Sequence, residues 1–365
     1  MTVTALGAPV RRDAALTERV LSAGAAAGLV AVGVTSAEPF ADVRATLEAR
    51  RASGYASSMQ FTYRNPTRST SPERILSGAQ SLVVGAWPTD AGAAPVPPAN
   101  GGRVARYVWR DHYGALRSAL DTVAGVLRGE GFEAVVVSDD NALVDRAAAH
   151  RAALGWYGKN ANVLVPGHGS WVVLGSVVTS APLVPAAAPV ADGCGTCTRC
   201  IDGCPTGAIV APGVVDARRC LAWLVQAEGS FPVEHRVALG DRIYGCDDCQ
   251  EVCPPARAVT RRATPKSNSA SAPTPDVVAD AKFVDLVQIL RSTDDELLAR
   301  HGRWYIAKRD PRYLRRNALI ALGNTADPHD EAVTDVVRQS ADSGDELLAE
   351  HARWALARLA ERASP

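Results

Sequence analysis

Eight cysteines, all between residues 194 and 253, constrain this 365-residue chain more than any other feature. They fall into two sets with regular spacing. The first set is the run Cys194-x2-Cys197-x2-Cys200-x3-Cys204-Pro205, and the second is Cys220 followed by Cys246-x2-Cys249-x3-Cys253-Pro254. Every cysteine belongs to one of these sets, so the fold must gather its thiols within one short segment.

The first run has the spacing of bacterial ferredoxins, in which the fourth cysteine binds a different cluster from the first three. A thiol at every third residue lets one loop reach three irons of a cubane before the chain leaves toward the neighbouring cluster. In the second set, Cys220 replaces a cysteine that the pattern would place near Ile243. The crossing rule predicts two [4Fe–4S] clusters, one bound by Cys194, Cys197, Cys200 and Cys253 and the other by Cys204, Cys220, Cys246 and Cys249.

Two other uses of the cysteines fit the spacing less well. Zinc sites generally use two separated C-x2-C pairs, and a third cysteine at the same spacing is superfluous for a tetrahedral ion. Disulfides would need an oxidising compartment, which nothing in the sequence supports. The clusters therefore indicate electron transfer, but they do not identify the reaction.

Hydrophobic patterning divides the chain into three regions. Amphipathic helices alternate with short apolar strands, which we expect at 81–87, 134–137 and 171–178. This alternation predicts an α/β domain over residues 1–185. A Pro- and Ala-rich linker leads into a ferredoxin-like module over residues 186–260, and a loose Pro-, Ser- and Thr-rich stretch separates it from a helical domain over residues 276–365.

The helical domain contains a weak internal repeat. Residues 314–322 align without gaps on residues 348–356, with apolar residues at helical spacing in both. Similar helices one repeat apart predict stacked hairpins of the HEAT type, whose period is about 40 residues. A plain helical bundle is the alternative.

Charge and hydropathy bear on nucleic-acid binding, membrane insertion and export. It has 39 Lys+Arg and 39 Asp+Glu, so any surface that attracts nucleic acid must be local. No apolar run reaches the roughly 18 residues of a membrane-spanning helix. Arg11-Arg12 could begin an export signal, but Asp13 and Glu18 interrupt the apolar stretch that should follow. We therefore expect a cytoplasmic protein.

Several segments resemble the tRNA epoxyqueuosine reductase family: residues 154–160, 193–207, 215–220, 242–250 and 314–324. The resemblance extends from about Gly28 to Leu359. It implies reduction of epoxyqueuosine in tRNA to queuosine, with the electrons passing through two [4Fe–4S] clusters to cobalamin. It also implies a cobalamin-binding domain like that of the reductive dehalogenases, and a helical tail that helps to hold tRNA.

The resemblance places the family's catalytic aspartate on Asp139, as the acid that protonates the leaving oxygen. Its neighbour Asp140 could exchange roles with it, and either carboxylate could instead cap the helix that follows. The expected cobalamin contacts are Met59, Ala105, Asp139, Val163, Ser170, Cys246 and Asp247. Some relatives have a cysteine where this chain has Ala105, so a thiolate role is absent there. The motif around Trp109 to Tyr113 is also altered.

Basic residues crowd the start of the helical domain, with Trp304 and Tyr305 among them. Phosphates attract such a surface, and an aromatic ring can stack on an unpaired base. The expected tRNA contacts are Arg218, Arg219, Arg312, Arg315 and Arg316. A solvated helix face is the alternative for this run of charge.

Two other functions fit the cysteine framework. One is a corrinoid-dependent reductive dehalogenase with a small substrate, for which a basic helical tail would be unnecessary. The other is a ferredoxin-like electron carrier, which would leave the long α/β region without a role. In each case we expect a monomer, and a small flavodoxin or ferredoxin as a plausible electron donor.

Overall fold

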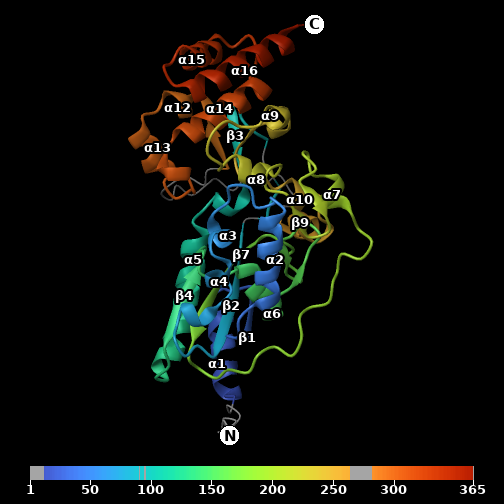
Figure 1. Ribbon diagram of the computed structural model, residues 1–365, viewed down its shortest axis with the longest axis vertical. Coiled ribbons are helices and arrows are strands. Elements are labelled where there is room, and N and C mark those ends of the chain that lie inside the picture. Colours follow the sequence, from blue (N-terminus) through green and yellow to red (C-terminus); the bar gives the residue numbers. More distant parts are fainter. Residues whose placement is uncertain (1–11, 90, 94–95, 264–281, 365) are drawn as a thin grey trace.

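The computed structural model describes residues 12–89, 91–93, 96–263 and 282–364. Figure 1 shows three regions along its long axis. A sheet flanked by helices lies at the end nearest the N-terminus, the cysteine segment lies beside its other end, and the C-terminal helices lie beyond both. No helix in the described ranges is long and apolar enough to cross a membrane.

A four-stranded sheet forms the centre of the first region. In spatial order its strands are β1 (Ala31–Ser36), β2 (Ser81–Pro88), β7 (Val172–Thr179) and β4 (Ala134–Ser138). Their Val-rich sequences favour extended backbone that is buried on both faces. Every neighbouring pair is antiparallel. Alternating strands and helices do not fix strand direction, so the expected α/β domain is an antiparallel sheet with helices on both faces.

Helices cover both faces of this sheet (Figure 1). They are α1 (Ala14–Ala26), α2 (Ala41–Ala52), α5 (His112–Gly129) and α6 (Asp145–Arg151). Successive side chains of a strand point to opposite faces. Val83 of β2 accordingly packs with Leu120 of α5, whereas Leu82 packs with Ala148 of α6. Both layers are apolar, which holds the loops at the strand ends in fixed positions.

The cysteine segment consists of short elements joined by tight turns. They are α7 (Arg199–Asp202), β8 (Ile209–Ala211), β9 (Val214–Val215), α8 (Leu221–Leu224), α9 (Val233–Leu239), β10 (Arg242–Tyr244), α10 (Asp248–Glu251) and α11 (Pro254–Ala263). The chain turns sharply after Cys204, where Gly207 has a φ of 59°. Glycine adopts this left-handed conformation at little cost. The thiols are thus carried mainly on turns and helix ends.

A second sheet joins the three regions of the chain. Its strands, in the order β10-β3-β11, are β10, β3 (Gly101–Val104) and β11 (Phe283–Asp285). β3 runs parallel to β10 and antiparallel to β11. A Cβ atom on Gly102 would collide with Leu286, so this close packing requires glycine. Further short elements of the first region are α3 (Phe61–Arg64), α4 (Pro66–Ser69), η1 (Pro72–Arg74), η2 (Arg106–Val108), β5 (Trp156–Tyr157) and β6 (Val163–Leu164).

The C-terminal region is helical apart from β11. Its helices are α12 (Leu286–Arg291), α13 (Asp294–His301), η3 (Ala307–Arg309), α14 (Arg312–Thr325), α15 (Glu331–Ala341) and α16 (Glu346–Ala363). The two aligned segments of the internal repeat lie within α14 and α16. These helices pack closely, because a Cβ on Gly323 would come within 2.9 Å of Ala355 Cα. The helical content is as predicted, and the HEAT type of the repeat stays a prediction.

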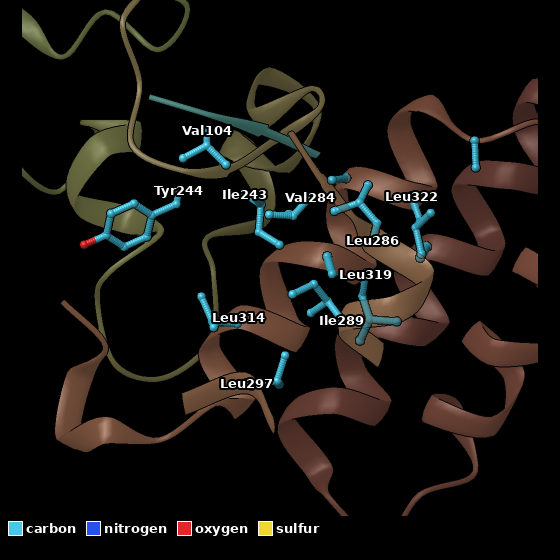
Figure 2. Close-up of a cluster of buried hydrophobic side chains, with 14 of the residues drawn as sticks. Val104, Ile243, Tyr244, Val284, Leu286, Ile289, Leu297, Leu314, Leu319 and Leu322 are labelled. Atoms are coloured by element: carbon cyan, nitrogen blue, oxygen red, sulfur yellow. The ribbon is translucent and has the colours of Figure 1, made fainter. Parts of the chain in front are cut away.

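The core of this region extends into the other two, as Figure 2 shows. Val104 of β3 and Ile243 of β10 belong to the same buried cluster as Leu286, Leu314 and Leu319. Each fully buried aliphatic side chain contributes about 1.5–3 kcal/mol. Removal of the C-terminal helices would expose this cluster, so their role is better tested by point substitutions than by truncation.

Candidate functional site

The thiols of the first predicted cluster lie close to one another. Burial is the largest cause that raises the pKa of Cys253, and three neighbouring thiols raise it further, those of Cys200, Cys194 and Cys197. Cys253 also packs with Trp171 and Ala256 in a small buried cluster. The turn before α11 therefore returns Cys253 to the run that ends at Cys204, 49 positions earlier in the sequence.

The second predicted set is gathered in the same way and is more deeply buried. Burial raises the pKa of Cys249 well above its usual value, and the thiols of Cys246, Cys220 and Cys204 raise it further, together with Asp247. Burial raises the pKa of Cys246 to about 12. The thiols that influence Cys249 and Cys253 thus belong to the same predicted set as each of them, and the assignment of the two sets to clusters stays a prediction.

The donor set fits iron–sulfur clusters. Without iron, the raised pKa values leave the buried thiols protonated, so bound iron would have to replace those protons. Among the described residues, no three His, Cys, Asp or Glu side chains converge on a single point as ligands of one metal ion. A cubane spreads four thiolates over separate irons, so its ligands need not converge on one point.

Asp139 lies directly after β4, at an edge of the sheet. Its φ of 54° is left-handed, which is uncommon outside glycine. Asp140 Oδ1 accepts a hydrogen bond from Ala142 N at 2.7 Å. The turn is anchored further by Ser69, whose Oγ donates to Asn141 O at 2.6 Å. Asp140 thus bonds the backbone of its own turn, and neither aspartate caps α6, whose N-cap is Val144. The Asp139 carboxyl is left available for chemistry.

The surroundings of Asp139 favour its protonated form. Burial by neighbouring protein is the largest cause that raises the pKa of this carboxyl, and the charge of Asp140 raises it further, while Arg117 lowers it. Its side chain remains accessible to solvent. A carboxyl that is reachable and holds its proton more tightly than usual is suited to donate it.

Two residues beside Asp139 were missed by the sequence analysis. Burial, followed by the charge of Asp139, raises the pKa of Asp145 well above its usual value. Burial also raises the pKa of Tyr113, and the charges of Asp139 and Asp145 raise it further. Tyr113 lies in the altered motif, so its identity was noted, but nothing in the sequence placed it beside Asp139.

Three of the expected cobalamin contacts line one small cleft. Ala105, Cys246 and Asp247 lie in it, with Arg106 and Trp109 on the same walls. Asp247 Oδ2 accepts a hydrogen bond from Arg106 N at 2.8 Å. Burial raises the pKa of Asp247 to about 6. β3 leads through Ala105 into η2, which carries Arg106 and is followed by Trp109, and β10 leads through Cys246 and Asp247 into α10.

The other expected cobalamin contacts lie on separate elements. Met59 follows α2 and is partly buried. Val163 is only 3% exposed and packs in the core beneath the sheet, so its side chain faces protein. Ser170 is buried, and its Oγ has no hydrogen-bond partner among the described residues. A buried hydroxyl without a partner calls for an explanation, and a polar group of a bound ligand is one.

Lys159 and Asn160 hold the cysteine segment against the first region. Lys159 Nζ donates to Gly195 O at 2.7 Å, in the loop between Cys194 and Cys197. Asn160 is 5% exposed, and its Nδ2 lies 3.5 Å from Cys249 O. The sequence left these residues open between ligand contact and solvation, and the structure gives both a contact with the cysteine segment.

Arg316 does not have the exposure that the predicted tRNA contact requires. It is 0% exposed, and its Nη1 donates to Ala227 O at 2.7 Å and Gly229 O at 2.6 Å. Its Nη2 donates to Leu224 O at 3.0 Å. The guanidinium therefore ties α14 to the chain after α8, and the prediction that it contacts tRNA is corrected.

The other four arginines reach the surface to different degrees. The Arg312 side chain is 47% exposed and pairs with Asp310, while that of Arg315 is 14% exposed and pairs with Asp294. The Arg218 side chain is 55% exposed and pairs with Asp216. Arg219 is also exposed. All four remain candidates for phosphate contacts, with Arg315 the least accessible.

Comparison with known proteins covers both the cysteine segment and the whole chain. A family model described as a 4Fe-4S double cluster binding domain matches residues 193–256, which contain all eight cysteines. An epoxyqueuosine reductase from Staphylococcus aureus is 33% identical over 306 residues, which are 81% of this chain and 77% of the relative. The similarity therefore extends well beyond the cysteines.

Two solved structures match most of the fold. A crystal structure of epoxyqueuosine reductase with an epoxyqueuosine-modified tRNA-Tyr stem loop has a TM-score of 0.82 and 29% identity, and the match covers 94% of this chain and 90% of that one. An epoxyqueuosine reductase from Bacillus subtilis, with an aspartate catalytic loop swung out of its active site, has a TM-score of 0.81 and 28% identity at the same coverage.

Proposed function

The chain belongs to the epoxyqueuosine reductase family, and from that membership we propose that it reduces epoxyqueuosine in tRNA to queuosine. The observation that carries the proposal is the match over 94% of the chain to a reductase bound to a modified tRNA stem loop. Removal of the epoxide oxygen as water consumes two electrons and two protons. The chain must therefore supply an electron path, an acid and a surface for RNA.

The electron path consists of the two cysteine sets. We assign one [4Fe–4S] cluster to Cys194, Cys197, Cys200 and Cys253 and the other to Cys204, Cys220, Cys246 and Cys249. Cys194 and Cys197 are partly exposed, whereas burial dominates the pKa shifts of the second set. Electrons from a small flavodoxin or ferredoxin would enter at the first cluster and leave through the second.

The cleft around Ala105 and Asp247 is the proposed cobalamin site. Cobalamin, when bound, supplies a reduced cobalt centre that can deliver electrons to an epoxide carbon. The residues that would hold it are Met59, Ala105, Asp139, Ser170, Cys246 and Asp247, and Val163 could contribute only its backbone because its side chain is in the core. The support from this chain is the convergence of three of them on one cleft and the unpartnered Oγ of Ser170. Cys246 would place the second cluster directly beside this cleft.

Asp139 is the proposed acid at the substrate. An alkoxide is a poor leaving group, so the departing oxygen must be protonated. Asp139 holds its proton more tightly than an ordinary aspartate and remains accessible. A catalytic loop bearing an aspartate is also a feature of the Bacillus subtilis relative. Asp140 is the weaker candidate, because it already bonds the backbone of its own turn.

The proposed RNA surface combines three exposed arginines, the less accessible Arg315 and one exposed ring. Arg218, Arg219, Arg312 and Arg315 would bind phosphates, whose attraction to cations dominates RNA affinity. Tyr305 is 51% exposed, while its neighbour Trp304 is 4% exposed. Tyr305 is therefore the ring available to stack on an unpaired base. Further proposals are that the chain acts in the cytoplasm as a monomer and that its helical tail is of the HEAT type.

Complementation tests the proposed function. The chain is expressed in bacteria that lack their own epoxyqueuosine reductase, and tRNA nucleosides are quantified by mass spectrometry. Wild type should convert epoxyqueuosine to queuosine, and Cys249→Ala should not. Persistent epoxyqueuosine in cells that contain folded, cluster-loaded wild-type protein and cobalamin would refute the proposal.

A further inference from the structure

A second carboxylic acid lies beside Asp139. Asp145 is the first residue of α6, and its Oδ1 is sealed from solvent without a hydrogen-bond partner among the described residues. Tyr113, near the start of α5, completes the group, because the charges of both aspartates raise its pKa after burial. We call Asp139, Asp145 and Tyr113 the acid cluster.

The groups that face Asp145 favour its neutral form. Burial is the main cause that raises its pKa well above the usual value, and the charges of Asp139 and Asp140 raise it further. Arg146 and a backbone hydrogen bond from Asp139 lower it without offsetting burial. A sealed carboxylate oxygen without a donor is costly. Burial and the unpartnered Oδ1 therefore favour the protonated form of Asp145, next to a more accessible acid.

The chemistry of the proposed reaction gives this stored proton a use. Two C–O bonds break, and the oxygen takes one proton to become a hydroxyl and a second to leave as water. The two electrons come from the external one-electron carrier through the clusters. Asp139 carries only one proton, so a second must reach it while the RNA substrate still covers the site.

We propose that Asp145 is a proton-relay residue that recharges Asp139 within one turnover. Asp139 first gives its proton to the oxygen. The Asp145 O–H then transfers its proton to the Asp139 carboxylate, which supplies the second protonation. Asp145 stays ionised until solvent reprotonates it after product release. Two acids thus provide two protons, and the Tyr113 hydroxyl, kept neutral beside them, adds no charge.

The proposal rests on the proposed function for its chemistry, but the protonation of Asp145 can be tested separately. Infrared spectra of the cluster-loaded protein at about pH 8 report the C=O stretch of a protonated carboxylic acid. Wild type, Asp139→Asn and the exposed control Asp121→Asn should have this band, and the double variant Asp139→Asn/Asp145→Asn should lose it. An Asp139→Asn spectrum without the band, or a band that survives in the double variant, would overturn the relay.

Kinetics on the modified stem loop complete the test. Asp145→Asn should lower kcat by about tenfold or more with KM unchanged, because a missing acid slows proton transfer. Asp145→Glu keeps the acid and should recover most of the rate, which separates proton transfer from loss of folding, and Asp121→Asn should match wild type. A wild-type kcat in Asp145→Asn would overturn the relay alone, whereas absence of queuosine with wild type would overturn the proposed function as well.

Discussion

The Arg316→Ala substitution should destabilise the protein by about 4–5 kcal/mol, because it removes the charge-assisted hydrogen bonds of a buried guanidinium. Arg316 donates to the carbonyl oxygens of Leu224, Ala227 and Gly229 at 2.6–3.0 Å. Hydrogen bonds from a charged donor contribute about 1.5 kcal/mol or more each. Three such bonds give about 4.5 kcal/mol.

Urea unfolding of the cluster-loaded protein measures this loss. Trp223 in α8 and Trp354 in α16 lie near this interface, so tryptophan fluorescence follows its separation. Arg312→Ala is the matched control on the same helix. Its side chain is 47% exposed and its ion pairs face solvent, so it should lose about 1 kcal/mol or less. It should, however, weaken binding of the tRNA stem loop.

Equal stability loss in the two variants would refute this reasoning. The same conclusion would follow if Arg316→Ala remained as stable as wild type but bound RNA more weakly. Arg316 would then act at the surface, and the hydrogen bonds that place it inside the protein would be wrong.

The remaining predictions concern the acid, the clusters and pH. Asp139→Asn should lower kcat by about 10²-fold or more, and Asp140→Asn by much less, in an epoxyqueuosine reduction assay. Cys253→Ala should lower the iron content from about eight to about four atoms per chain by elemental analysis, if each cluster depends on its own four thiols. His351 Nε2 accepts from Phe231 N at 3.1 Å, and burial, the largest cause, lowers its pKa to about 4. Between about pH 6.5 and 4 the unfolded state therefore binds more protons than the folded state. As the pH falls through this window, the thermal stability of wild type should fall, and that of His351→Gln should fall less.

The cysteine framework was predictable because its signal is local and chemical. Ligand spacing within 194–253 determines which thiols can share a cubane. This spacing can be read from the sequence without knowing how the surrounding fold buries the thiols. The strands of the first sheet were predictable for a similar reason, since runs of valine favour extended backbone. Strand direction was not, because it depends on how connections cross the sheet.

The burial of individual polar side chains could not be predicted from the sequence. Arg315 and Arg316 are adjacent and chemically identical, yet one pairs with Asp294 at the surface and the other is enclosed by backbone carbonyls. Only the packing of α14 against the chain after α8 distinguishes them. Asp145 is a similar case, because the first turn of a helix commonly contains a solvated aspartate. Its role follows from the burial of one oxygen beside Asp139.

The central claim is that this chain reduces the epoxide on tRNA with electrons that pass through its two cysteine sets. The most direct measurement uses protein reconstituted without oxygen, a strong reductant, cobalamin and an epoxyqueuosine stem loop, with queuosine quantified by nucleoside mass spectrometry. The account predicts queuosine that requires cobalamin and disappears in Cys249→Ala and Asp139→Asn. Unchanged epoxyqueuosine with intact clusters and bound cobalamin would contradict it.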